Sequence, residues 1–143
     1  MKLSHHAIIS GVASTVVVAV NAPITLGISL FIAGVFIDLD HWFDYFREYG
    51  MRMNVNRFFA MHNATRFRKL ILPLHAWEWI LILAAVTLHR GCPPLLCGVT
   101  LGLGLHMALD QWSNGGIRSA YFFTARMRLK FKTSQIFPGK GID

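Results

Sequence analysis

Residues 24–41 read ITLGISLFIAGVFIDLDH, an uncharged apolar run that ends in two aspartates and a histidine. The run predicts a helix in an apolar environment whose C-terminal end presents Asp38, Asp40 and His41. Ionisable side chains at the end of such a run are costly to bury, so they are candidates for a functional site. This stretch therefore predicts a membrane helix that carries part of a polar site.

Three further apolar runs and the overall composition extend the same interpretation to the whole chain. The runs cover residues 7–20, 71–88 and 95–109, and short proline-containing turns at 21–23 and 89–94 join them into two hairpins. Hydrophobic residues make up 54% of the chain and charged residues only 15%, whereas a soluble domain has roughly a quarter charged residues. We predict an all-α integral membrane protein with a single membrane domain, 1–143. Its four short transmembrane helices are expected at about 5–21, 23–41, 71–89 and 94–111.

Basic and aromatic residues surround the predicted helices on one side. Segments 42–70 and 117–132 are expected to form interfacial amphipathic helices that lie on anionic lipids. Of the 14 lysines and arginines, all but Arg90 fall on this side, so the positive-inside rule places both termini in the cytoplasm. We expect a multi-pass protein of the inner (cytoplasmic) membrane. The net charge of +7 does not indicate a nucleic-acid partner, because nucleic-acid domains do not carry four apolar runs.

The predicted topology brings the scattered polar residues to one membrane face. Two hairpins place the start of the first helix, the end of the second, the start of the third and the end of the fourth on the same side. The polar residues at these four ends are His5 and His6; Asp38, Asp40 and His41; His75 and Glu78; and His106 and Asp110. Spacings of three or four residues put Asp38 with His41, His75 with Glu78, and His106 with Asp110 on shared helical faces.

Imidazoles and carboxylates in this number predict a metal site. They exceed the four ligands of one tetrahedral ion, so we expect one or two divalent transition metal ions (Zn, Mn or Fe). The expected ligands are His5 or His6, Asp38, His41, His75, His106 and Asp110. The choice between His5 and His6 stays open. Asp40 is expected to accept a proton, to bridge two metals or to orient a ligating histidine, and Glu78 is the other expected proton acceptor.

Several segments resemble a bacterial and archaeal family of inner-membrane metal-dependent hydrolases, sometimes described as LexA-binding. The resemblance rests on GVFIDLDH at 34–41, a histidine-containing first helix and His106-x-x-x-Asp110. The segments LPLHAWE at 72–78, LDQ at 109–111 and YFF at 121–123 look like a smaller branch of that family. The chain departs from the family in lacking its His-Arg-x-x-Thr-His motif. The resemblance therefore implies metal binding more than any particular substrate.

The function expected from these residues is hydrolysis of a phosphate ester of a membrane lipid at the cytoplasmic face. Metal ions would activate water there, and Arg66, Arg68 and Arg118 are the expected contacts to the phosphate. Two alternatives belong to other classes. One is a membrane protein that binds or transports metal without catalysis, and the other is a non-haem di-iron oxidoreductase, which also uses histidines and carboxylates on helices.

Overall fold

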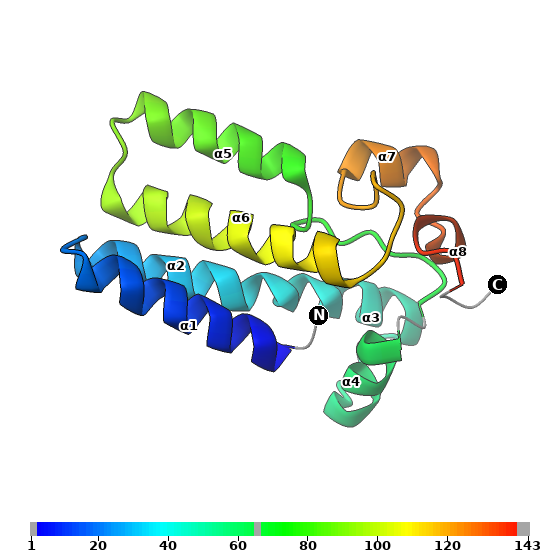
Figure 1. Ribbon diagram of the computed structural model, residues 1–143. Coiled ribbons are helices and arrows are strands. Elements are labelled where there is room, and N and C mark those ends of the chain that lie inside the picture. Colours follow the sequence, from blue (N-terminus) through cyan, green and yellow to red (C-terminus); the bar gives the residue numbers. More distant parts are fainter. Residues whose placement is uncertain (1–2, 65–66, 140–143) are drawn as a thin grey trace. The chain divides into compact units, whose positions relative to one another are not determined.

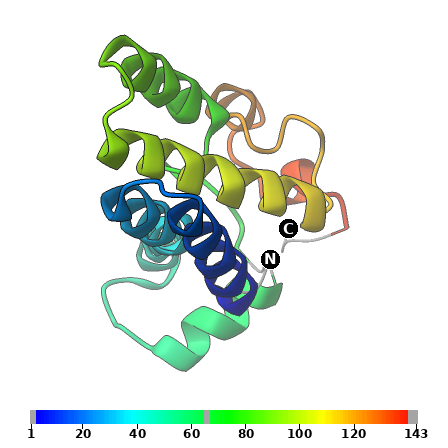
Figure 2. The ribbon, with the colours of Figure 1, turned by 60° about the vertical axis from the view of Figure 1, so that its left-hand side comes forward.

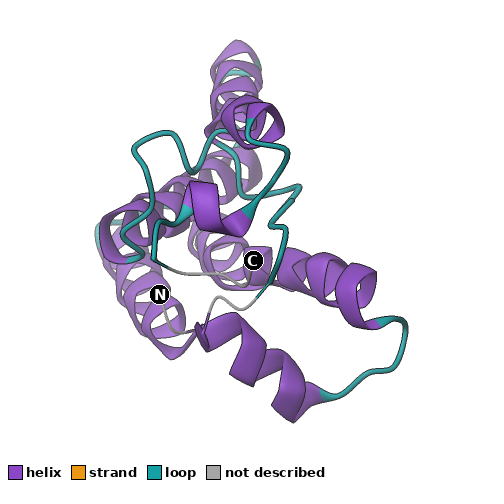
Figure 3. Cartoon of the chain, turned by 90° about the vertical axis from the view of Figure 1, so that its right-hand side faces the viewer, coloured by secondary structure: helices purple, strands orange, loops and turns teal. Residues whose placement is uncertain are grey.

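The computed structural model describes residues 3–64 and 67–139, with the side chains of 61–64 left out. This part of the chain is helical and contains no strand (Figure 3), which confirms the all-α prediction at that level. The helices are α1 (Leu3–Ala19), α2 (Ile24–Phe36), η1 (Ile37–Asp40), α3 (His41–Tyr49), α4 (Val55–Ala64), α5 (Trp77–His89), α6 (Pro94–Ser113), α7 (Phe123–Arg128) and α8 (Thr133–Ile136). Contacts divide the chain into a first unit, Met1–Asp38 with Trp77–Ser113, and a second unit, Leu39–Ala76 with Asn114–Asp143.

The first unit is a bundle of the four helices that correspond to the four apolar runs. Helix α1 lies beside α2, α2 beside α6 and α6 beside α5, as the two views in Figures 1 and 2 show. Asn21 ends the first hairpin turn in a left-handed conformation (φ 67°), and Pro23 directly precedes α2. Gly91 and Cys92 do the same in the second turn, and Pro94 begins α6, where its missing N–H has no helical partner to lose.

Small residues allow α2 and α6 to pack closely. A Cβ at Gly102 would meet the Leu30 carbonyl, the Gly34 nitrogen at 3.0 Å and the Ala33 Cβ at 3.1 Å. A Cβ at Gly34 would meet the Ser10 side chain of α1. Such small-residue contacts are typical of helices packed in membranes. Gly34 and Gly102 therefore permit the close packing, whereas Gly104 takes no part in it, since its Cβ would have no neighbour within 4 Å.

Side chains in the first unit are distributed with the apolar ones outside and the small or polar ones inside. The residues buried in α1 are His6 and Ser10, and those in α6 include two glycines, His106 and Asp110. Large apolar side chains four residues apart are exposed on α1 and α2: Ile8, Val12 and Val16, and Ile24, Ile28, Ile32 and Phe36. One helical stretch in the described chain, Ile24–Tyr49, is long and apolar enough to cross a membrane.

The second unit differs from the interfacial helices expected at 42–70 and 117–132. Instead of one amphipathic helix, the segment 117–132 contains the six-residue α7 with irregular residues before and after it, and α8 begins only at Thr133. Arg126, expected on a lipid-facing surface, is 1% exposed and donates to the backbone carbonyls of Leu72 and Ala120. Asp44, in the segment expected to lie on the membrane surface, is 0% exposed in α3. Asp44 and Arg126 therefore make long-range bonds to the backbone of residues 71 and 72 instead of facing outward.

Candidate metal centre

His106 lies at the centre of a polar cluster inside the first unit. It projects from the last part of α6 and is fully buried. Its Nδ1 lies 2.8 Å from the carbonyl oxygen of Gly34 near the end of α2. A carbonyl can only accept, so Nδ1 carries the hydrogen and donates it. In the neutral ring this leaves the lone pair on Nε2, where a metal can bind.

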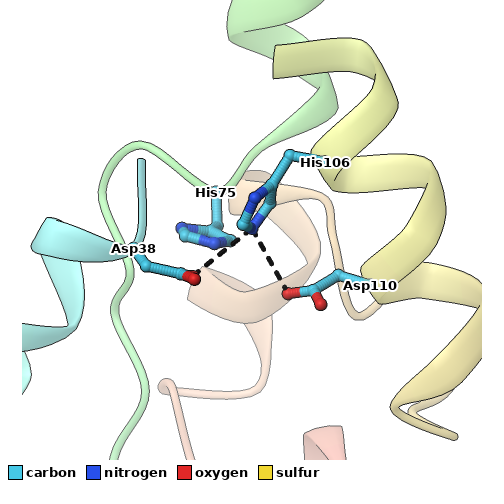
Figure 4. A group of neighbouring side chains, drawn as sticks. All are labelled: Asp38, His75, His106 and Asp110. Atoms are coloured by element: carbon cyan, nitrogen blue, oxygen red, sulfur yellow. Dashed lines mark ion pairs between the residues drawn. The ribbon is translucent and has the colours of Figure 1, made fainter. Parts of the chain in front are cut away.

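Two carboxylates face that lone pair. The His106 Nε2 lies 3.3 Å from Asp38 Oδ1 and 3.7 Å from Asp110 Oδ2. Figure 4 shows both carboxylates turned toward the His106 ring, Asp38 from the helical end at Ile37–Asp40 and Asp110 one turn further along α6. Potential ligand atoms of these three residues lie within 4.8 Å of one another. The predicted spacing of His106 and Asp110 on one helical face is therefore confirmed.

The structure selects His6 over His5. The His6 side chain is buried, its Nε2 lies 3.0 Å from Asp110 Oδ1, and its ring stacks on that of His106 with centroids 3.8 Å apart. His6 Nδ1 is also buried and has no hydrogen-bond partner among the described residues. His5, the preceding residue of α1, is exposed. Three helix ends of the first unit thus converge, as the hairpin topology predicted.

A second His/Asp group lies within the second unit. His75 Nδ1 lies 2.9 Å from Asp40 Oδ1, and the rings of His75 and His41 make an edge contact with centroids 5.1 Å apart. All three residues are buried and offer ligand atoms within 4.8 Å of one another. The other oxygen of Asp40 accepts the backbone N–H of Leu74 at 2.9 Å. A carboxylate close to one ring nitrogen can orient a histidine so that the other nitrogen binds metal.

His75 is not part of a helix, contrary to the expected helix over 71–89. Residues 71–76 are irregular, and α5 begins only at Trp77. Carboxylates elsewhere in the chain accept the N–H groups of Ile71, Leu72 and Leu74, and the φ of Leu72 is 45°, which a right-handed helix does not allow. The shared helical face predicted for His75 and Glu78 is therefore wrong. Glu78 is half-buried in the first turn of α5 and belongs to neither described His/Asp group.

Two of the three predicted phosphate contacts, Arg68 and Arg118, lie among the described residues. Arg68 and Arg118 are exposed in the second unit, and the backbone N–H of Arg68 donates to the Glu48 carboxylate at 3.0 Å. Arg66 lies outside the described residues, as does the side chain of His62. Sequence reasoning missed the Gly34 carbonyl, because a backbone acceptor carries no residue-type signal. It also assigned Asp44 and Arg126 to the surface, since no local pattern marks a buried charge.

The donor chemistry of both groups suits a divalent metal ion. The first-unit group offers imidazole nitrogens from His6 and His106 and carboxylate oxygens from Asp38 and Asp110, a mixture that Zn, Mn and Fe accept. His106 also has the backbone partner on its far nitrogen that metal-binding histidines usually have.

In comparisons with known proteins, no family model matches the chain, and no curated protein or solved structure shows significant similarity to it.

Proposed function

We propose that this protein is a membrane-embedded, metal-dependent hydrolase that cleaves a phosphate ester of a membrane lipid. The observation that carries the metal part of the proposal is the position of His106 Nε2. Its lone pair faces two carboxylates at 3.3 and 3.7 Å, while the opposite nitrogen is bonded to the Gly34 carbonyl. Three electron-rich groups held together in a buried site repel one another unless a cation lies among them.

Either a proton on Nε2 or a metal ion could supply the positive charge. Two features favour the metal. The second unit also places a carboxylate against a buried histidine, at 2.9 Å from His75 Nδ1, and both groups contain the mixed nitrogen and oxygen donors of catalytic transition-metal sites. When bound, such a metal acts as a Lewis acid on a phosphoryl oxygen and lowers the pKa of water toward neutrality.

The protein's own residues would divide the remaining tasks. Asp38, His106 and Asp110 would hold the metal, and His6 would fix Asp110 through the 3.0 Å contact. Asp40 would orient His75 rather than take a proton, because both its oxygens already face that segment. Glu78 stays the proposed proton acceptor, since it is half-buried and separate from the ligands in the same unit. An acceptor that is not a ligand can be removed without loss of the metal.

The distribution of apolar side chains supports the membrane part of the proposal. Every fourth residue along the exposed face of α2, from Ile24 to Phe36, is a large apolar residue. Contiguous apolar patches of this kind are rare on soluble monomers. With four spans, as we propose, the site lies near the headgroup level of the cytoplasmic leaflet of the inner membrane. A lipid phosphate already lies at that depth, and the basic residues of segments 42–70 and 117–132 would attract anionic lipids.

Elemental analysis followed by substrate turnover tests the proposal. Protein purified in detergent should retain one or two transition-metal ions per chain, and His106→Ala should lose at least one. Metal-loaded protein should release phosphate or a headgroup from a mixed lipid extract, as read by mass spectrometry, and should leave soluble phosphate esters largely intact. Equal metal content in wild type and His106→Ala would refute the metal site. Equal turnover of soluble and lipid esters would refute the lipid specificity.

One observation favours the non-catalytic alternative, a membrane protein that binds metal without turning over a substrate. In the first-unit group His6 and His106 are 0% exposed and Asp110 is 4% exposed, which is the closed environment of a structural site. The Asp38 side chain, at 13%, is the most accessible member. If the wild-type protein binds metal but turns over no lipid, this alternative is correct. Bound iron with an oxygen-sensitive optical band would instead indicate the di-iron oxidoreductase.

A further inference from the structure

Leu72, in the irregular segment ahead of His75, is held from both sides by buried charged groups. Its N–H donates to Asp44 Oδ2 at 3.0 Å, and its carbonyl accepts from Arg126 Nη2 at 3.0 Å. Asp44 is 0% exposed and Arg126 is 1% exposed. The peptide group before Leu72 is thus bonded to an anion, and the peptide group after it is bonded to a cation. The two charged residues lie far apart in the sequence. Hydrogen bonds to charged groups are about twice as strong as neutral ones.

The backbone at Leu72 is strained, and the bonds to Asp44 and Arg126 can hold it in this conformation. Its φ is 45°, in the left-handed region that a branched side chain adopts only at a cost. Strain of this kind persists only where the surroundings fix the conformation. Asp44 Oδ2 also accepts the N–H of Ile71 at 2.8 Å, so a single carboxylate oxygen fixes two consecutive residues.

The strained residue is bonded directly to the backbone of His75. The His75 N–H donates to the Leu72 carbonyl at 3.2 Å, the same oxygen that accepts from Arg126. Residues 71–76 belong to no helix, so no regular ladder of hydrogen bonds determines where the His75 ring points. The position of His75 beside Asp40 therefore depends on the bonds to Leu72 and on the Leu74 N–H bond to Asp40.

We propose that Asp44 and Arg126 are positioning residues, which clamp Leu72 and thereby hold the His75 ring against Asp40 for metal binding. The role in metal binding rests on the proposed function, whereas the orientation of His75 does not. Burying a carboxylate and a guanidinium costs several kcal/mol each unless their bonds compensate it. Bonds that only closed a loop could be made by neutral side chains. Two charged groups bonded to one strained residue are consistent with a role in holding the His75 ring in one orientation.

Two variants with matched controls test the proposal. Asp44→Asn and Arg126→Lys each weaken one side of the clamp while nearly conserving size or charge. Glu48→Gln is the control for the first, because Glu48 lies one turn further along α3 and accepts the N–H of Arg68, upstream of Leu72. Arg128→Lys is the control for the second, because Arg128 is exposed on the same helix α7. Folding of each variant is checked by circular dichroism and thermal unfolding.

The first readout needs no metal. In metal-free protein labelled with ¹⁵N-histidine, at one fixed pH, both test variants should move the His75 ring nitrogen signals toward those of a free imidazole, and both controls should not. The second readout is zinc affinity by chelator competition, where the test variants should lose about 10- to 100-fold at one site. Unchanged His75 signals in a folded test variant would overturn the proposal. Loss of the fold in both test variants would also overturn it, because the clamp would then be structural. Failure of the wild type to bind zinc would refute the proposed function alone.

Discussion

Replacing Gly102 with alanine should loosen the first-unit metal site from a distance. The added Cβ would lie against the Leu30 carbonyl, 3.0 Å from the Gly34 nitrogen and 3.1 Å from the Ala33 Cβ. Comfortable contacts between such atoms are about 3.5–4.0 Å, so α6 must move away from α2 by at least about 0.5–1 Å, and the Leu30 carbonyl requires the larger movement. Overpacking of this size costs about 1–3 kcal/mol of the free energy of unfolding.

The same movement acts on His106, one turn further along α6. Its Nδ1 lies 2.8 Å from the Gly34 carbonyl, and a separation of 0.5–1 Å would stretch this bond to roughly 3.3–3.8 Å, past the usual limit of a hydrogen bond. The tautomer and orientation of the ring would no longer be fixed. We therefore expect metal affinity at the first-unit site to fall about 10-fold or more, as when other outer partners of metal-binding histidines are lost.

Gly104→Ala is the matched control, since its Cβ would have no neighbour within 4 Å on the same helix. It should leave metal affinity unchanged and alter stability by no more than about 1 kcal/mol, in the stabilising direction. Unfolding in mixed detergent can be followed by tryptophan fluorescence, and metal affinity by chelator competition. If Gly102→Ala and Gly104→Ala unfold alike and bind metal alike, the close approach of α2 and α6 does not determine the site.

Three further predictions concern the site and the topology. His6→Ala should lose most of the first-unit metal after dialysis against a weak chelator, while His5→Ala keeps it, because His6, unlike the exposed His5, contacts Asp110. Equal retention of metal by the two variants would contradict the assignment. Glu78→Gln should greatly reduce lipid turnover while metal content, measured by elemental analysis, stays at the wild-type level; full activity would remove Glu78 as the proton acceptor. A reporter fused after Asp143 should be active only in its cytoplasmic form, and a periplasmic signal would reverse the proposed orientation.

Hydrophobic runs and turn residues were sufficient to predict the helices of the first unit. The prolines and the left-handed turn residues define both hairpins, and hairpin geometry alone brings His6, Asp38 and His106 to one end. The sequence alone does not distinguish the adjacent residues His5 and His6. The structure does, because only the His6 side chain turns to the buried face of α1. These predictions succeed because they depend on local periodicity and on connectivity.

The second unit could not be predicted in the same way, because long-range bonds determine its backbone. Residues 71–76 continue an apolar run and look helical, yet Asp44, 27 and 28 positions earlier, accepts the N–H groups of Ile71 and Leu72. Arg126 is one of several basic residues in its segment, and nothing in the local pattern distinguishes it as buried. A bond between residues so far apart leaves no periodic signal.

The separation between the two faces of the first-unit helices has a consequence for protein engineering. The residues that hold the site, such as His106 and Gly102, face inward, whereas Val16, Ile28 and Ile32 face outward and make none of the bonds described above. The outward set could therefore be exchanged for glutamate, lysine and glutamine without altering the interior. A variant redesigned in this way would provide the same His/Asp arrangement in water, where its spectroscopy and crystallisation do not require a detergent.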